Sequence, residues 1–335
     1  QVRANRVIVS RKSKNYYINM ERKISFANLQ EVVKSAYELN KSEKGGTIDP
    51  RVASEAKAGS FGISVVLTDG RSVDKGDADA LFALGKIARI PLAVVLKTQQ
   101  AAAAKDGQGT HCGCGCDKGG ACSCAGHEKK EKLPLGRCGI RAISAIVPQG
   151  DPEGKYGVIS DMLVALANSE PAFSDNLYKL YQEEVASMDI VNAYKNSELK
   201  LADDVAQCID MYTRLMSTEL SARQLATVGA TIAADGRNPY SGEYAFDGSI
   251  AADVVALLAT RGKHFARHWL RKTGLPGIHS FAGAIIAILP GFGAIVAYSP
   301  ELNDCGVSIK AANAIEYIAT QLQLNVFASA RVTVE

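Results

Sequence analysis

The sequence predicts an α+β protein of the broad α/β class, in which helices flank an antiparallel sheet and a further lobe is all-helical. Two short runs rich in β-branched and apolar residues, 282–289 and 294–298, are separated by a Pro-Gly-Phe-Gly segment. A later run, 309–322, has apolar residues at helical spacing. Together these runs predict two paired strands followed by an amphipathic helix.

The separating segment, 290–293, contains proline and glycine, which supply turn geometry and favour a hairpin. Ser308 is a candidate N-cap for the helix that follows. Its apolar positions share one face, so we expect the helix to lie across the sheet; they are Ala311, Ala314, Ile315, Ile318 and Leu322.

The remaining elements divide the chain into a predicted arm and a predicted main domain. Residues 1–45 form a basic N-terminal arm and a helix, and residues 46–335 form the domain. Within it, a sheet lobe covers about 46–80 and 270–335, with first strands near 63–71. A helical lobe covers about 81–269 and carries a cysteine-rich loop at 106–132.

Composition is that of an ordinary globular protein. The 335 residues include 38 basic and 35 acidic side chains, a net charge of +3. No apolar run reaches the roughly 18 residues that a membrane span needs, although peripheral membrane contact stays open. Because neither a nucleotide-binding glycine pattern nor an aromatic-interleaved basic strand is present, we expect no nucleic acid partner.

The first 23 residues are strongly basic, with seven arginines and lysines against Glu21. Such an arm is either a solvated tail or a dock for an acidic partner surface. The chain does not begin with methionine, and Val2-Arg3-Ala4 resembles the end of a chloroplast transit peptide. We therefore expect an organelle, chloroplast rather than mitochondrion, with the cytoplasm as the alternative.

Five of the eight cysteines fall within residues 112–124. Cys-x-Cys pairs can place soft thiolates around one ion, and Zn²⁺ or Cu(I) would suit them. Thiol redox switching and a loop without a fixed partner stay open beside metal binding. The candidate metal ligands are His111, Cys112, Cys114, Cys116, Cys122, Cys124 and His127.

Three separated segments resemble, in order, the serine-dependent glutaminases, which are relatives of the β-lactamases. They are Phe61-Gly62-Ile63-Ser64 with the following turn, the stretch 217–243 ending in Asn238-Pro239-x-x-Gly242-Glu243, and Ser299-Pro300-x-Leu302-x-x-x-Gly306-x-Ser308. The resemblance covers roughly residues 46–327. It implies the β-lactamase-like fold, and by itself it says little about activity.

In that family, as in other Ser-x-x-Lys enzymes, a serine at the start of a helix attacks the carbonyl and a lysine one turn later helps to remove its proton. The resemblance places Lys86 at the serine position and Arg89 at the lysine position. A lysine amine is protonated near neutral pH unless it is strongly desolvated, and arginine cannot accept a proton. We therefore expect the family's Ser/Lys pair to be lost.

The resemblance places further family positions, of which Glu184 and Tyr212 keep the family residue. Both also fit ordinary helix positions. The second family asparagine falls at Val191, with Asn192 next to it, and the Lys-Ser-Gly strand is replaced by Ile278-His279-Ser280. Arg141 stands in place of the first asparagine, and Lys263 falls near the position of a family tyrosine. Phe281 occupies the position whose backbone amide would, with that of the nucleophile, make the oxyanion hole.

Lys86 and Arg89 lie one helical turn apart. If both face the cleft, they repel each other unless an anion or a carboxylate lies between them. This predicts an anion-binding cleft at Lys86 and Arg89. The alternative is a filled cleft with both side chains reaching solvent.

Two functions follow from these observations. The favoured one is a catalytically inactive glutaminase-like protein, a pseudoenzyme that serves as a structural, docking or regulatory subunit of a larger assembly or homo-oligomer. The alternative is an active or altered glutaminase or amidohydrolase that converts glutamine to glutamate and ammonia. Ser144 and Ser280 are the candidate substitute nucleophiles, although neither has a lysine one turn away in the sequence.

Overall fold

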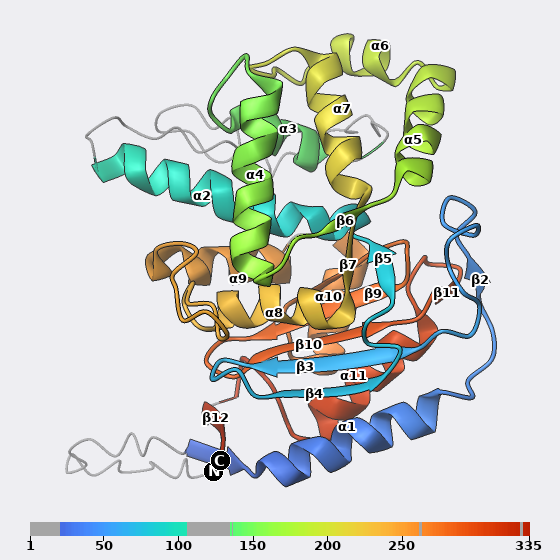
Figure 1. Cartoon of the computed structure of the whole chain (residues 1–335), viewed down its shortest axis with the longest axis vertical. Helices are drawn as coiled ribbons and strands as arrows, with labels where there is room; N and C mark the ends of the chain where they lie inside the picture. The colour runs from blue at the N-terminus through green and yellow to red at the C-terminus, as the bar shows by residue number, and fades with distance from the viewer. Residues whose placement is uncertain (1–20, 106–134, 136, 261–262, 329–330) are drawn as a thin grey trace, which may run out of the picture.

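A computed structural model of the chain describes residues 21–105, 135, 137–260, 263–328 and 331–335. Its centre is a five-stranded antiparallel sheet in the order β4-β3-β10-β9-β8 (Figure 1). The strands are β3 (Gly62–Leu67), β4 (Ser72–Gly76), β8 (Gly277–His279), β9 (Ala284–Leu289) and β10 (Gly293–Tyr298). The predicted mixed fold with an antiparallel sheet is confirmed.

The hairpin and the helix after it form as predicted. Strands β9 and β10 pair antiparallel, with Gly293 opposite Leu289 at the turn. Helix α11 (Ile309–Gln321) begins after Ser308, whose hydroxyl accepts a hydrogen bond from the Ala311 amide. Glu301 and Leu302 form the short strand β11, which pairs with β2 (Thr47–Ile48).

Helices cover both faces of the sheet, so β3 and β10 are buried along their whole length. Alternate side chains pack in opposite directions, as a period of two requires. Ile63, Val65 and Ile295 belong to a core with α1 (Phe26–Asn40) and α11, whereas Val66 and Val296 belong to a core with α8 (Ala222–Ala233). The layers are therefore α1 and α11, then the sheet, then α8 (Figure 1).

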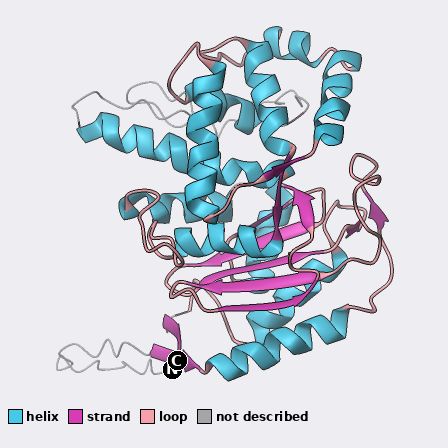
Figure 2. Cartoon of the chain, in the orientation of Figure 1, coloured by secondary structure: helices cyan, strands magenta, loops and turns pink. Residues whose placement is uncertain are grey.

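A group of helices lies beyond α8, on the side away from α11 (Figures 1 and 2). A small sheet, β5-β7-β6, made of Leu81–Ala83, Thr218–Ser221 and Ala172–Phe173, links this group to the main sheet. The helices are α2 (Arg89–Lys105), α3 (Arg137–Ala145), α4 (Pro152–Ala167), α5 (Asp175–Ser187), α6 (Ile190–Lys195) and α7 (Val205–Met216).

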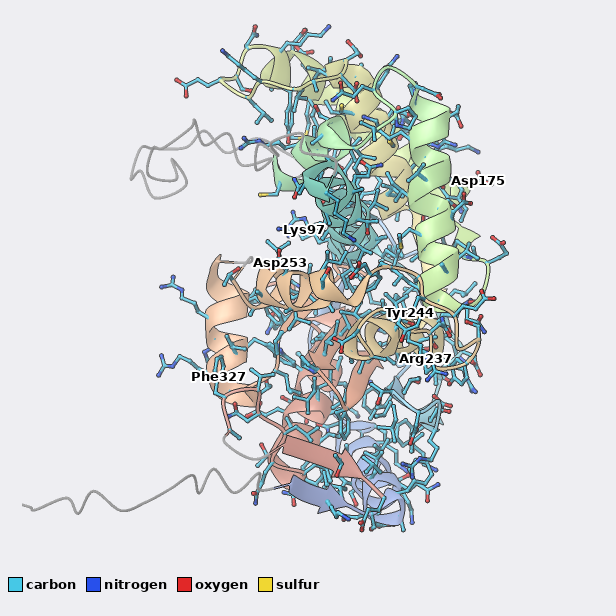
Figure 3. All side chains as sticks on the ribbon, turned by 90° about the vertical axis from the view of Figure 1, so that its left-hand side faces the viewer. Lys97, Asp175, Arg237, Tyr244, Asp253 and Phe327 are labelled. Atoms are coloured by element: carbon cyan, nitrogen blue, oxygen red, sulfur yellow. The ribbon has the colours of Figure 1, made fainter. Side chains whose placement is uncertain are left out.

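Two further helices, α9 (Ala251–Thr260) and α10 (Lys263–Thr273), follow the short turn η3 (Gly248–Ile250) and lead back to the sheet at β8. Lys97 on α2 pairs with Asp253 on α9 at 2.9 Å, which ties the helical group to this return (Figure 3). The two described ends of the chain meet in a parallel pair, β1 (Glu21–Ile24) with β12 (Arg331–Val334).

Several predictions concern residues outside the described ranges. The first 20 residues of the basic arm and all seven candidate metal ligands of the cysteine-rich loop lie there. Within the described ranges, no group of three or more histidine, cysteine or acidic side chains is placed to hold a metal ion. No helix in those ranges is long and apolar enough to cross a membrane.

Candidate functional site

The two side chains at the predicted Ser-x-x-Lys positions follow strand β5. Lys86 lies in a short 3₁₀ turn, η1 (Gly85–Ala88), and Arg89 begins α2. Gly85 has φ +50°, and a Cβ there would lie 2.6 Å from the Phe281 ring. Only glycine therefore suits this entry to the helix, where the backbone just before Lys86 packs against Phe281.

Lys86 is accessible to solvent, yet neighbouring protein atoms and charges act on its amine. Loss of water around it lowers its pKa below the usual value, and the positive charges of Arg89 and Arg51 lower that pKa further. Among the described residues, no carboxylate pairs with Lys86 and no side chain hydrogen-bonds to its amine. The amine is therefore easier to deprotonate than that of an ordinary surface lysine.

Arg89 is hydrogen-bonded to Tyr212, one of the two positions that keep the family residue. Its Nε donates a hydrogen bond of 3.2 Å to the hydroxyl of Tyr212, which α7 places wholly inside the protein. A Cβ at Gly139 would lie 2.2 Å from the Tyr212 ring, so α3 leaves room for that ring. Burial alone would lower the pKa of Arg89, but Tyr212 offsets this effect and Arg89 stays charged.

Arg51 is a third cation at this site, and the sequence analysis missed it. Its guanidinium makes a two-pronged contact with Asp49, at 2.9 and 2.7 Å, and lies 4.1 Å above the Phe281 ring. The hydrogen bond with Asp49 raises the pKa of Arg51, and Glu184 adds to that effect. The Asp-Pro-Arg turn carries no motif that would have revealed it.

Tyr181 completes the site beside Phe281. The two rings meet edge to face, with centroids 6.4 Å apart. Tyr181 is 1% exposed, and its hydroxyl has no hydrogen-bond partner among the described residues. It precedes Glu184 by three positions on α5, and this helical spacing could have pointed to it.

The other positions that the family resemblance indicated show no described contact with Lys86. Arg141 is half-buried on α3, and Val191 is half-buried on α6. Asn192 is exposed, and its amide donates to Asp189 at 2.9 and 3.1 Å. Lys263 begins α10, but its side chain lies outside the described part.

Ser280, one of the two candidate substitute nucleophiles, has its hydroxyl hydrogen-bonded to backbone groups. Its hydroxyl donates to the Ala83 carbonyl at 2.9 Å and accepts from the Ala282 amide at 3.1 Å. The residue is fully buried. Ser280 therefore fixes the strand against β5 and is not placed as an accessible nucleophile.

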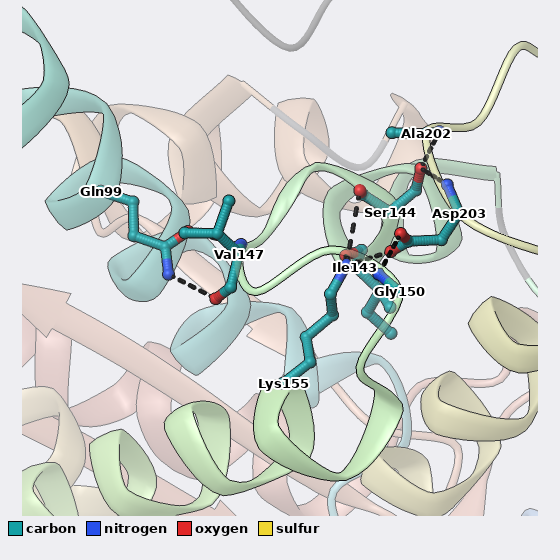
Figure 4. A network of polar contacts seen from close by, with 8 residues as sticks. All are labelled: Gln99, Ile143, Ser144, Val147, Gly150, Lys155, Ala202 and Asp203. Carbon is teal, nitrogen blue, oxygen red and sulfur yellow. Dashed lines mark hydrogen bonds and ion pairs between the residues drawn. The ribbon is translucent and has the colours of Figure 1, made fainter.

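Ser144, the other candidate, belongs to a buried polar network (Figure 4). Its hydroxyl accepts from the backbone amides of Ala202 and Asp203. Lys155 pairs with the Asp203 carboxylate, and its amine also donates to the Ile143 carbonyl at 2.9 Å. Because the Asp203 carboxylate and the Ile143 carbonyl occupy the Lys155 amine, this lysine is not placed as a base for Ser144.

His279 lies at the edge strand β8, where the resemblance expects the Lys-Ser-Gly strand. Its ring packs 4.5 Å from that of Phe265, and its Nδ1 is buried without a partner among the described residues. Burial lowers the pKa of His279 to about 4, and the charges of Lys86 and Arg89 contribute in the same direction. The imidazole is therefore neutral at pH 7.

This pKa predicts a loss of stability in mild acid. The unfolded chain takes up a proton at His279 near pH 6.5, whereas the folded chain takes it up only near pH 4, so stability falls as the pH drops through that window. This pKa shift limits the loss of unfolding free energy that His279 can cause to on the order of 3 kcal/mol. We expect thermal unfolding between pH 7 and pH 4 to show a smaller loss in His279→Gln; equal losses would contradict the prediction.

Comparison with known proteins places this geometry in a family. Residues 50–327 match the family model described as Glutaminase. The chain belongs to the glutaminase family. A glutaminase of Bacteroides thetaiotaomicron is 31% identical over 316 residues, which cover 92% of this chain and 97% of that protein. One from Parabacteroides distasonis is 30% identical over 325 residues, 94% of this chain and 99% of that protein.

Solved structures agree with this family assignment. A probable glutaminase, ybaS, has a TM-score of 0.74 at 28% identity and covers 91% of this chain and 99% of its own. The covalent complex of the Bacillus subtilis glutaminase YbgJ with 5-oxo-L-norleucine has a TM-score of 0.71 and covers 90% of this chain and 99% of its own. At 18% identity, the second likeness concerns the fold alone.

The expectation of a catalytically inactive subunit was wrong. Relatives that are named glutaminases match this chain over nearly its whole length, which points to an enzyme. The inactive interpretation rested on the loss of the Ser/Lys pair, whose positions are occupied by Lys86 and Arg89. In the structure, desolvation and the charges of Arg89 and Arg51 lower the pKa of Lys86 below its usual value. The comparisons likewise give no support to a complex subunit, a chloroplast protein or a metal-binding loop.

Proposed function

We propose that this glutaminase-family chain hydrolyses the side-chain amide of glutamine to glutamate and ammonia. The observation that carries the proposal is the match of relatives named glutaminase, at 30–31% identity, to more than nine-tenths of the chain. The site at Lys86 supports it, because it combines an amine of lowered pKa with cationic hydrogen-bond donors.

Lys86 is the group that we place at the reacting amide. If its amine attacked the amide carbon, the product would be another amide, about as stable as the substrate, and turnover would stop. A neutral Lys86 can instead act as a general base towards water. The lowered pKa increases the fraction of Lys86 in this neutral form.

Hydrolysis of the amide then proceeds in the following steps. The Lys86 amine removes a proton from water while the water oxygen bonds to the amide carbon, giving a tetrahedral intermediate. The carbon–nitrogen bond breaks as the Lys86 ammonium returns that proton to the leaving nitrogen. Ammonia and the γ-carboxylic acid result, and transfer of the acid's proton gives ammonium and glutamate. Arg51 and Arg89 are the charged groups beside Lys86 that would stabilise the oxyanion of the intermediate.

The test is ammonia release from L-glutamine by the purified full chain and by Lys86→Met. We expect a loss of about 10²- to 10⁴-fold in kcat for Lys86→Met, the usual contribution of a general base. In the unchanged chain, kcat should rise with pH until Lys86 is neutral, with a midpoint below that of an ordinary lysine.

Lys97→Met is the matched control, because Lys97 is a half-buried lysine on α2 whose partner Asp253 lies outside the site. It should release ammonia at the rate of the unchanged chain. Absence of ammonia release from the unchanged chain would overturn the proposed function. Release that Lys86→Met leaves intact would overturn only the role given to Lys86.

A further inference from the structure

Helix α10 has a basic outer face. Every exposed side chain described on this helix is basic, and together they form two pairs four positions apart, which places them on one side of it; they are Arg267, His268, Arg271 and Lys272. On the opposite side, Trp269 and Thr273 are 5% and 4% exposed. The apolar side of α10 therefore packs inside the protein, and the basic side is left to solvent.

The chain places little negative charge against this face. Residues 254–300, which include α10, contain no aspartate or glutamate. Glu316 on α11 pairs with Lys272 at 2.6 Å, in a contact whose members are 32% and 50% exposed. Among the side chains of α10 and Glu316, the three positive charges of Arg267, Arg271 and Lys272 stand against one negative charge. The face is therefore suited to an anionic surface.

An exposed aromatic side chain lies at the C-terminal end of the same helix (Figure 3). Phe327 is 71% exposed. The segment that carries it is fixed to the end of α10, because the Val326 amide donates to the Gly274 carbonyl at 3.0 Å. An apolar ring without cover therefore stands next to the helix turn that carries Arg271 and Lys272.

This chemistry fits a membrane surface that contains anionic phospholipid. Each lysine or arginine near such a surface strengthens binding roughly fivefold. Helix α10 cannot bury its own apolar side in the bilayer, because that side packs inside the protein, so Phe327 is the apolar group available to enter the boundary between headgroups and acyl chains. A nucleic acid would match the charge, but its backbone surface offers no apolar layer for Phe327.

We infer that the outer face of α10, with Phe327 at its end, docks the protein on membranes that contain anionic phospholipid. The cations meet the headgroups, and the Phe327 ring enters the layer below them. This interaction goes beyond the proposed function, because it uses none of the residues given a role in hydrolysis.

The test is co-sedimentation of the purified full chain with two kinds of vesicle, phosphatidylcholine alone and phosphatidylcholine with phosphatidylserine in equal parts. The chain should bind the anionic vesicles only, and added salt should weaken this binding. Arg267→Gln combined with Arg271→Gln should weaken it on the order of 25-fold, because two charges are lost. Phe327→Ala should weaken it at least about fivefold, because the apolar contact is lost.

Two controls make the test specific to α10. The first 20 residues carry five further cations, so binding by itself does not identify the face. Lys179→Gln combined with Lys195→Gln removes the same charge from exposed positions on α5 and α6, and it should leave the affinity within about twofold. Glu316→Gln releases Lys272 and should tighten binding roughly fivefold, a gain that a folding defect cannot produce.

Equal binding to the two kinds of vesicle would overturn the inference, and so would failure to bind either. An equal loss in the α10 variant and in the Lys179 and Lys195 variant would show that only total charge matters, and would also overturn it. Binding to a DNA duplex as tight as that to anionic vesicles, with Phe327→Ala without effect on either, would assign the face to nucleic acid instead.

Discussion

Replacing Lys155 with methionine is expected to lower the free energy of unfolding by about 3–5 kcal/mol, the usual cost of leaving one member of a buried ion pair alone. The side chains of Lys155 and Asp203 are 1% and 7% exposed, so water can replace little of what the Asp203 carboxylate would lose. The lysine also binds the Ile143 carbonyl, which would lose its donor (Figure 4). Urea unfolding of the two proteins measures the difference.

Two further variants make this test specific. Lys97→Met removes an ion pair whose members are 31% and 61% exposed, and it should cost no more than about 1 kcal/mol. Lys155→Met combined with Asp203→Asn should recover part of the loss, because the amide removes the buried charge and keeps an acceptor for the Gly150 amide. A cost for Lys155→Met as small as that for Lys97→Met would show that the pair is not buried in solution.

Local patterns allowed parts of the fold to be predicted from the sequence. The hairpin and α11 depend on a glycine-containing turn, a serine cap and apolar spacing within a few residues of one another. Such signals lie within a short stretch of sequence and do not depend on contacts that form only in the folded chain. The pairing of β1 with β12 was not predicted, since it joins residues more than 300 positions apart and no local pattern marks it.

The candidate site shows the same division. Lys86, Arg89 and Tyr212 were placed by resemblance to short family segments, and the structure brings Arg89 and Tyr212 into contact. Arg51 was missed because only the folded chain brings it to Phe281. Tyr181 was missed although it lies three positions before Glu184 on the same helix. The inactive interpretation failed for a related reason. It allowed for desolvation and for the neighbouring Arg89, but it lacked Arg51, a third charge that only the folded chain brings near Lys86 and that also lowers the pKa of Lys86.

Gly229 on α8 makes the second large prediction, which concerns how closely that helix approaches the sheet. A Cβ at this position would lie 2.4 Å from the Ala294 Cβ and 2.9 Å from the Ile286 Cδ1. Both neighbours are wholly buried in β10 and β9, so neither can move aside freely. Gly229→Ala should therefore lower the free energy of unfolding by about 1–3 kcal/mol, as overpacking of a core does.

The sign of this change is the informative part, because alanine normally stabilises a helix interior by about 0.5–1 kcal/mol relative to glycine. Gly157 on α4 has no atom within 4 Å of where its Cβ would stand, so Gly157→Ala should show the normal gain. Gly229→Ala should be partly rescued by Ala294→Gly, which removes the clashing methyl group. If both alanine variants gain stability in urea unfolding, α8 does not approach β10 as closely as described. If Gly157→Ala gains stability and Gly229→Ala loses it, the contact of Gly229 with Ala294 sets the spacing between the sheet and α8.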